Sequence, residues 1–244
     1  MCQTVPCDPR QLGVKADNLL CFRNIIFDLD GTLIDSARLT GAIIDQMLVA
    51  RGIEAHADRA LIRRMDAIGG AAMIAAVLGP HSSNPETEIA EFRALHQEIV
   101  VPADLPFAGV TETLAQLTAS GVGLAICSNK PQALCEKILS ELGLANHFAA
   151  IVGSAPDRAR KPAPETALLA LERLGGTPSD TLYCGDSSID LATAQAAGLA
   201  VALVGWGYGT AEALKTKPDT PVLETMSALI ETLGGHGRLH FPRR

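Results

Sequence analysis

The chain has few aromatic residues, no excess of positive charge and no long apolar run. Aromatic residues make up 4% of its 244 positions, so aliphatic side chains must fill any core. Acidic residues outnumber Lys and Arg by 27 to 20, and the net charge of −7 argues against a nucleic-acid partner or an anionic membrane surface. No apolar stretch reaches the roughly 18–20 residues of a membrane helix, so we expect no membrane association. A small anionic substrate remains compatible with this balance.

The chain also has no C-x-x-C pair among its six cysteines, and two of these, Cys127 and Cys184, lie in apolar runs. A zinc site or disulfide framework is therefore not expected, and we predict a reducing, cytoplasmic setting. Residues 1–16 are polar and lack the apolar stretch of a secretory signal. Residues 1–22 show no helical or strand period, and we expect them to be a mobile leader.

Short apolar runs bounded by Gly, Ser or Asp alternate with helical patterns along the chain. Such runs are typical of strands buried on both faces of a sheet. They span residues 24–30, 122–128, 149–153, 181–186 and 199–204, with helices expected at 110–119, 131–142, 164–174 and 190–197. We therefore predict an α/β fold with a doubly wound parallel sheet of the Rossmann-like kind.

One long segment interrupts this alternation. Residues 37–103 show helical periods alone, as in the amphipathic face formed by Ile43, Ile44, Met47 and Leu48. We predict that they form a small all-helical cap domain inserted into a core of residues 23–36 and 104–244. Within it, Arg63 and Arg64 precede a glycine pair and are candidates for binding a second anionic group of a substrate, although a solvated helix face is the competing interpretation.

Two carboxylates end the first predicted strand of the core. Asp28 and Asp30 lie two residues apart, so in an extended strand they share one face. Their repulsion would amount to a few kcal/mol at an effective dielectric of about 20, which favours a metal site or acid–base task over chance. Simple solvation at the strand end is the alternative.

A second acidic pair, Asp186 and Asp190, follows a later strand. Because ligands bind at the carboxyl ends of parallel strands, we expect both pairs and Ser128 to converge on one crevice. Asp186 as a helix N-cap and Asp190 as a first-turn helix residue are the competing interpretations.

Charge balance and donor chemistry predict what fills this crevice. Ionised Asp28, Asp186 and Asp190 would be neutralised by one divalent cation together with one lysine, for which Lys161 is the candidate. Oxygen ligands that leave room for water and phosphate suit Mg²⁺. Ser128 and Asn129, placed before a predicted helix, would offer a hydroxyl and free backbone N–H groups to a phosphate.

These motifs together resemble the haloacid dehalogenase superfamily. The four that carry the resemblance are DLDGTLIDS at 28–36, Ser128, KPAP at 161–164 and GDSSID at 185–190. The segments at 128–130, 161–165 and 206–209 are most similar to the phosphoglycolate phosphatase group. The leader and residues 234–244 lie outside the resemblance.

The resemblance implies a role for each carboxylate. Asp28 would be the nucleophile that forms an aspartyl-phosphate, and Asp30 would act as general acid and then general base. The metal set would be the Asp28 carboxylate, the Asp30 backbone carbonyl and Asp186, with Asp190 as an indirect partner. Dehalogenases of the superfamily lack a carboxylate at the position of Asp30, so its presence favours phosphoryl transfer.

The resemblance also assigns the phosphate contacts and the reaction. Ser128 and Asn129 would hold the phosphoryl group, and Lys161 would neutralise both it and Asp28. The predicted activity is Mg²⁺-dependent hydrolysis of a small phosphorylated metabolite, with 2-phosphoglycolate as the best candidate. A sugar-phosphate phosphatase, a β-phosphoglucomutase-like phosphomutase and a catalytically silent binding protein are the alternatives, and the oligomeric state stays open.

Overall fold

The computed structural model describes residues 19–66, 69–234 and 238–242. A six-stranded sheet forms its centre, in the order β4-β3-β2-β5-β6-β7, with every pair of neighbours parallel. Its strands are β2 (Asn24–Phe27), β3 (Gly123–Pro131), β4 (Ala150–Ser154), β5 (Thr181–Gly185), β6 (Ala200–Val204) and β7 (Val222–Leu223). The chain moves outward from β2 in both directions, which confirms the doubly wound parallel sheet.

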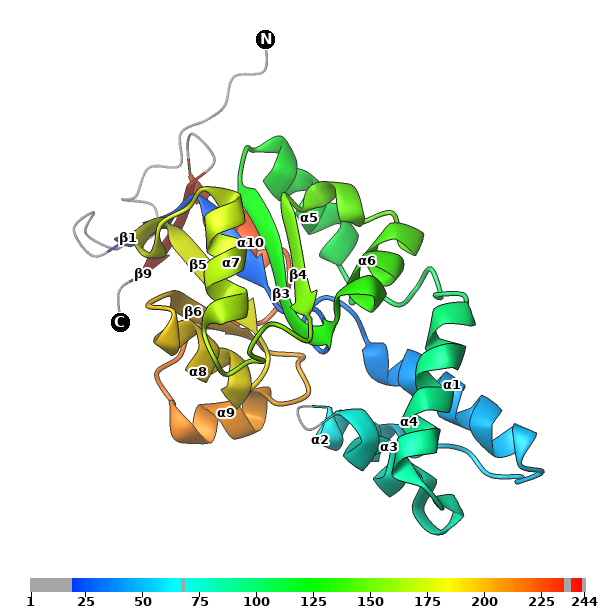
Figure 1. Ribbon diagram of the computed structural model, residues 1–244. Helices are drawn as coiled ribbons and strands as arrows, with labels where there is room; N and C mark the ends of the chain where they lie inside the picture. The colour runs from blue at the N-terminus through cyan, green and yellow to red at the C-terminus, as the bar shows by residue number, and fades with distance from the viewer. Residues whose placement is uncertain (1–18, 67–68, 235–237, 243–244) are drawn as a thin grey trace.

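Alternating side chains of the strands supply two separate apolar layers. Ile25 and Phe27 of β2 pack into one cluster, and Ile26 packs into the other. The first layer is covered by α5 (Val110–Ala119) and α6 (Gln132–Glu141), and the second by α7 (Glu165–Leu174) and α8 (Ser188–Ala196), as Figure 1 shows. Helices α9 (Thr210–Thr216) and α10 (Ala228–Glu231) follow the last core strands. Burial on both faces explains why these strands are apolar throughout rather than alternating.

All five strands expected from the sequence are present, but other strands escaped prediction. Strand β7 has two residues, too few for a visible period. A separate antiparallel sheet joins β1 (Leu19–Phe22), β9 (Arg238–Pro242) and β8 (Leu233–Gly234). Residues 19–22 of the predicted leader, which show no strand period in the sequence, thus form a strand that pairs with the distant C-terminal segment. Residues 1–18 lie outside the described part of the chain.

Helices occupy the segment between β2 and α5. They are α1 (Ser36–Ala50), α2 (Arg59–Met65), α3 (Gly70–Leu78) and α4 (Pro85–Glu98), with a short 3₁₀ turn at Gly79–His81. Figure 1 shows them grouped beyond the ends toward which β3 and β4 point. We refer to this group as the helical insert. No helix in the described ranges is long and apolar enough to cross a bilayer.

Candidate active site

Three buried carboxylates meet where β2 and β5 end. Asp28 follows β2, Asp186 follows β5, and Asp190 lies in the first turn of α8. An oxygen from each lies within 4.8 Å of the others. The sequence expectation that the two acidic pairs converge is therefore confirmed for these residues. Burial, with repulsion from Asp190 and Asp30, raises the pKa of Asp28 to about 7 despite the nearby Lys161.

Glycines allow Asp186 to lie this close to β2. Gly31 has a φ of +73°, and a Cβ there would lie 2.5 Å from Asp186 Oδ2. The backbone N–H of Tyr208 donates to that same oxygen at 2.7 Å. Burial and repulsion from Asp190 and Asp28 raise the pKa of Asp186 well above its usual range. Asp186 Oδ2 thus has a fixed position.

Lys161 is the cation of this cluster. Its Nζ lies 2.9 Å from Asp28 Oδ1 and 2.7 Å from Asp190 Oδ1, and it also donates to the backbone carbonyl of Cys127. Its side chain is 3% exposed, which excludes an ordinary surface lysine. Burial alone would lower the pKa of Lys161, but the carboxylates of Asp190 and Asp28 hold it well above its usual value. Lys161 is therefore protonated beside the candidate nucleophile.

The carboxylate of Asp190 already has several hydrogen-bond partners. Its Oδ1 accepts from Lys161 and from the Tyr183 hydroxyl, and its Oδ2 accepts from the Ser187 hydroxyl at 2.6 Å and from two backbone N–H groups. Ser187 is the N-cap of α8 and forms a capping box with Asp190. The N-cap interpretation of Asp186 is therefore wrong. Despite burial, Lys161 and these hydrogen bonds hold the pKa of Asp190 below its usual value.

Ser128 and Asn129 lie at the site, although not at a helix N-terminus. Strand β3 continues through Pro131 and α6 begins at Gln132, one residue after the predicted start of this helix at residue 131, so Ser128 and Asn129 lie in the strand and Pro131 is the N-cap. The side chain of Asn129 exchanges two hydrogen bonds with the backbone of Lys161, at 2.8 and 3.0 Å. Ser128 accepts from the backbone N–H of Lys130. Asn129 therefore positions the loop that carries Lys161.

Asp30 pairs with Lys130, which the sequence left open between a phosphate contact and a solvated surface residue. Lys130 Nζ lies 3.2 Å from Asp30 Oδ1, and both side chains are largely buried. Burial opposes the charge of Lys130, but Asp30 raises its pKa above the usual value. Lys130 follows Ser128 and Asn129 in the sequence, so its position at the end of β3 was the available signal.

A cavity of about 540 Å³ joins this cluster to the helical insert. Both Arg63 and Arg64 line it. Arg63 is already engaged, because its guanidinium lies 2.9 Å from Asp35 and 5.7 Å from the centre of the Tyr208 ring. The Tyr208 hydroxyl donates to the other oxygen of Asp35. Arg64 is exposed and has no hydrogen bond or ion pair to any described residue.

The helical insert contributes two further titratable groups that the sequence did not reveal, Asp66 and His96. Burial, together with repulsion from Asp30, raises the pKa of Asp66 to about 8, so Asp66 is largely uncharged at neutral pH. Burial and the positive charge of Lys130 lower the pKa of His96 to about 4. His96 is 2% exposed, and its position on the buried stripe of α4 made it indistinguishable from a core residue in the sequence.

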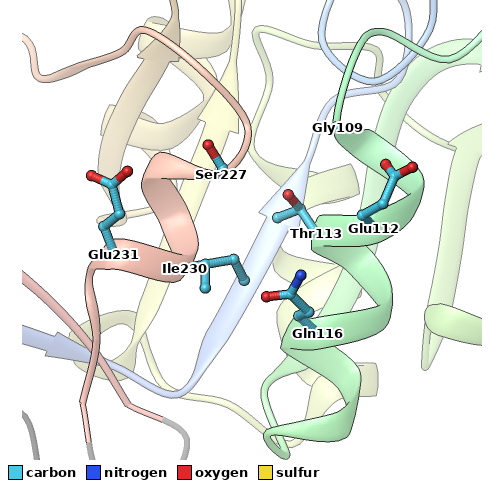
Figure 2. A pocket seen from close by; sticks show the side chains of 7 residues that line it. All are labelled: Gly109, Glu112, Thr113, Gln116, Ser227, Ile230 and Glu231. Carbon is cyan, nitrogen blue, oxygen red and sulfur yellow. The ribbon is translucent and has the colours of Figure 1, made fainter.

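A second hollow, of about 490 Å³, lies between α5 and α10 and is away from these groups. In Figure 2, Thr113 and Gln116 of α5 lie across from Ile230 of α10. Its charged lining residues are Glu112 and Glu231, and no predicted site residue lines it. Nothing in this hollow matches the chemistry that the sequence predicts.

The donor set at the first site fits a hard divalent cation. All three clustered groups are carboxylates, and hard cations prefer oxygen ligands. The space that Asp186 occupies exists because residues 31 and 207 have no side chain: a Cβ at either would lie within 3 Å of an Asp186 side-chain atom. A cation there would also offset the repulsion that raises the pKa of Asp28 and of Asp186.

Comparisons with known proteins agree with this geometry. Residues 25–204 match a family model described as haloacid dehalogenase-like hydrolase. The chain is 32% identical over 226 residues to a phosphoglycolate phosphatase of Pectobacterium atrosepticum, covering 91% of this chain and 96% of that protein. It is 35% identical over 211 residues to a phosphoglycolate phosphatase of Xylella fastidiosa, covering 86% and 89%. A crystal structure described as a predicted phosphoglycolate phosphatase from Haemophilus somnus superposes with a TM-score of 0.73 at 26% identity, covering 87% and 98%.

Proposed function

The chain belongs to the haloacid dehalogenase-like hydrolase family, and on that premise we propose that it hydrolyses 2-phosphoglycolate with the help of Mg²⁺. It is an enzyme of the phosphatase type, so the alternative of a catalytically silent binding protein is set aside. The observation that carries the proposal is the buried contact of Lys161 with Asp28 beside Asp186. The named relatives support the choice of substrate.

Asp28 is the nucleophile in this proposal. Its carboxylate attacks phosphorus, the bond to the ester oxygen breaks, and an aspartyl-phosphate forms. Lys161, 2.9 Å away, offsets the repulsion between the carboxylate and the phosphate. The Ser128 hydroxyl and the backbone N–H of Asn129 hold the phosphoryl oxygens. Water then hydrolyses the aspartyl-phosphate and releases inorganic phosphate.

Asp30 acts as the general acid in the first step and the general base in the second. It gives a proton to the leaving oxygen and takes one from the attacking water, a contribution of roughly 10²–10⁴-fold. Lys130, 3.2 Å away, holds its carboxylate in place. The residues that would hold Mg²⁺ are Asp28, Asp186 and the backbone carbonyl of Asp30, and the bound ion supplies charge neutralisation. Asp190, already hydrogen-bonded through both oxygens, positions Lys161 instead.

The test is a screen of small phosphoesters ranked by kcat/KM, with Mg²⁺ and with EDTA. We expect 2-phosphoglycolate to rank first, EDTA to abolish turnover and added Mg²⁺ to restore it. Free phosphate must appear in step with substrate loss. A phosphomutase would instead produce a second sugar phosphate, and turnover that persists in EDTA would refute the metal assignment.

A further inference from the structure

The face of α4 that lines the active-site cavity contains an imidazole whose Nδ1 has no hydrogen-bond partner among the described residues. His96 is 2% exposed, and its Nδ1 is fully buried without an acceptor or donor within reach among the described residues. The ring contacts Phe92 edge to face, with 5.7 Å between ring centres. Leaving a buried polar group unpaired is costly, so a bound group that supplies the partner would stabilise this position.

The surroundings of His96 indicate where in the cavity that ligand lies. The ion pair of Lys130 and Asp30 is close enough to influence His96 electrostatically. Asp30, the proposed proton donor to the leaving oxygen, and His96 line the same cavity, and on that ground we place His96 on the leaving-group side. His96 is uncharged at neutral pH, and one of its ring nitrogens carries a proton that it can donate.

The charges around His96 indicate what kind of group it meets. Arg93 precedes it by one turn of α4, lines the same cavity, and has no hydrogen bond or ion pair in the described part of the chain. Residues three apart on a helix share a face. Arg64 also lines the cavity and is likewise unpaired. Two cations without counter-ions among the described residues, lining the same cavity as a neutral donor, favour an anionic leaving group over a neutral one.

We propose that His96 is a specificity-determining residue, which donates a hydrogen bond to a carboxylate on the leaving group, with Arg93 supplying the charge. This inference rests on the proposed phosphatase activity and deepens it, because it assigns the group that distinguishes a carboxylated phosphoester from an uncharged one. Ile89 and Phe92, which also line the cavity, form the apolar wall beside the short carbon chain.

The test compares two substrates of similar size in three variants. 2-Phosphoglycolate carries the carboxylate, and ethyl phosphate has a methyl group in its place. A hydrogen bond to a charged group is worth about 10–100-fold in affinity. In His96→Phe we therefore expect kcat/KM for 2-phosphoglycolate to fall by about 10–100-fold, largely through KM. Activity on ethyl phosphate should stay within about twofold, which also shows that the variant is folded.

Two further variants separate hydrogen bonding from packing. His96→Asn keeps a donor near the ring Nδ1 position and should recover part of the lost discrimination. The matched control is His81→Phe, an exposed histidine of the same helical insert that does not line the cavity, and it should alter neither substrate. An equal loss on both substrates in His96→Phe, or no loss on either, would overturn the assignment of His96.

The two proposals fail in different ways. If the unaltered enzyme prefers 2-phosphoglycolate and His96→Phe keeps that preference undiminished, the specificity role is wrong and the proposed function stands. If another carboxylated ester, such as 3-phosphoglycerate, is the better substrate and its turnover alone depends on His96, the substrate assignment is wrong and the role of His96 stands. If the unaltered enzyme does not prefer carboxylated esters, both are wrong.

Discussion

Replacing Asp28 with asparagine should stabilise the metal-free protein above neutral pH while abolishing catalysis. The pKa of Asp28 is raised from 3.8 to about 7, chiefly by burial. The folded protein therefore binds a proton at this group more tightly than the unfolded chain does. Its stability falls as the pH rises from 3.8 toward 7, because folding then requires a buried negative charge. Asparagine removes that requirement.

The magnitude follows from the two pKa values. Each pKa unit corresponds to about 1.4 kcal/mol. Ionisation of Asp28 therefore lowers the free energy of unfolding by at most about 4 kcal/mol near pH 8, and by about 2 kcal/mol near pH 5. Loss of the Asp28–Lys161 contact does not reverse this, because Lys161 keeps its contact of 2.7 Å with Asp190. The advantage of Asp28→Asn should therefore grow with pH.

Urea unfolding in excess EDTA, at about pH 5 and about pH 8, measures this difference. Asp219→Asn, at an exposed position, is the matched control, and its free energy of unfolding relative to the unaltered protein should not increase with pH. Adding Mg²⁺ should reduce the difference in the free energy of unfolding between the unaltered protein and Asp28→Asn, since a bound cation stabilises the ionised carboxylate. If Asp28→Asn is equally destabilising at both pH values, the account of the buried charge is refuted.

Two other substitutions test the structure around the nucleophile. Lys161→Met should lower kcat by about 10²–10³-fold and destabilise the fold by about 3–5 kcal/mol, because the buried Asp190 then loses its cationic partner. Steady-state kinetics and urea unfolding measure the two effects, and an unchanged stability would contradict the pairing. Gly31→Ala should destabilise the fold by about 1–3 kcal/mol and weaken Mg²⁺ binding, because its φ of +73° and its closeness to Asp186 leave no room for a Cβ; a titration that shows unaltered Mg²⁺ affinity would argue against this constraint.

The sequence predicted the sheet and its catalytic edge because both depend on local pattern. Each of the five expected strands is a short apolar run, and parallel strands bring the carboxyl ends of such runs to one side. The convergence of Asp28, Asp186 and Asp190 follows from that topology. Lys161 follows β4 by several residues, and the motif that contains it was sufficient to place it at the site.

The residues that the helical insert contributes to the cavity could not be predicted from the sequence. Asp66 and His96 reach the cavity because the insert packs over the end of the sheet, and no local pattern encodes that contact. His96 shares a buried stripe with Phe92, so its spacing was that of a core residue. Strand β1 was missed for a related reason: its partner, β9, lies at the other end of the chain.

The central claim is that Asp28 receives the phosphoryl group, and chemical trapping tests it most directly. Borohydride added during turnover reduces an aspartyl-phosphate to homoserine, which mass spectrometry of the digested protein can locate. We expect homoserine at position 28 when substrate and Mg²⁺ are present, and none in their absence or in Asp28→Asn. Modification of another residue, or unmodified Asp28 during rapid release of phosphate, would contradict the account.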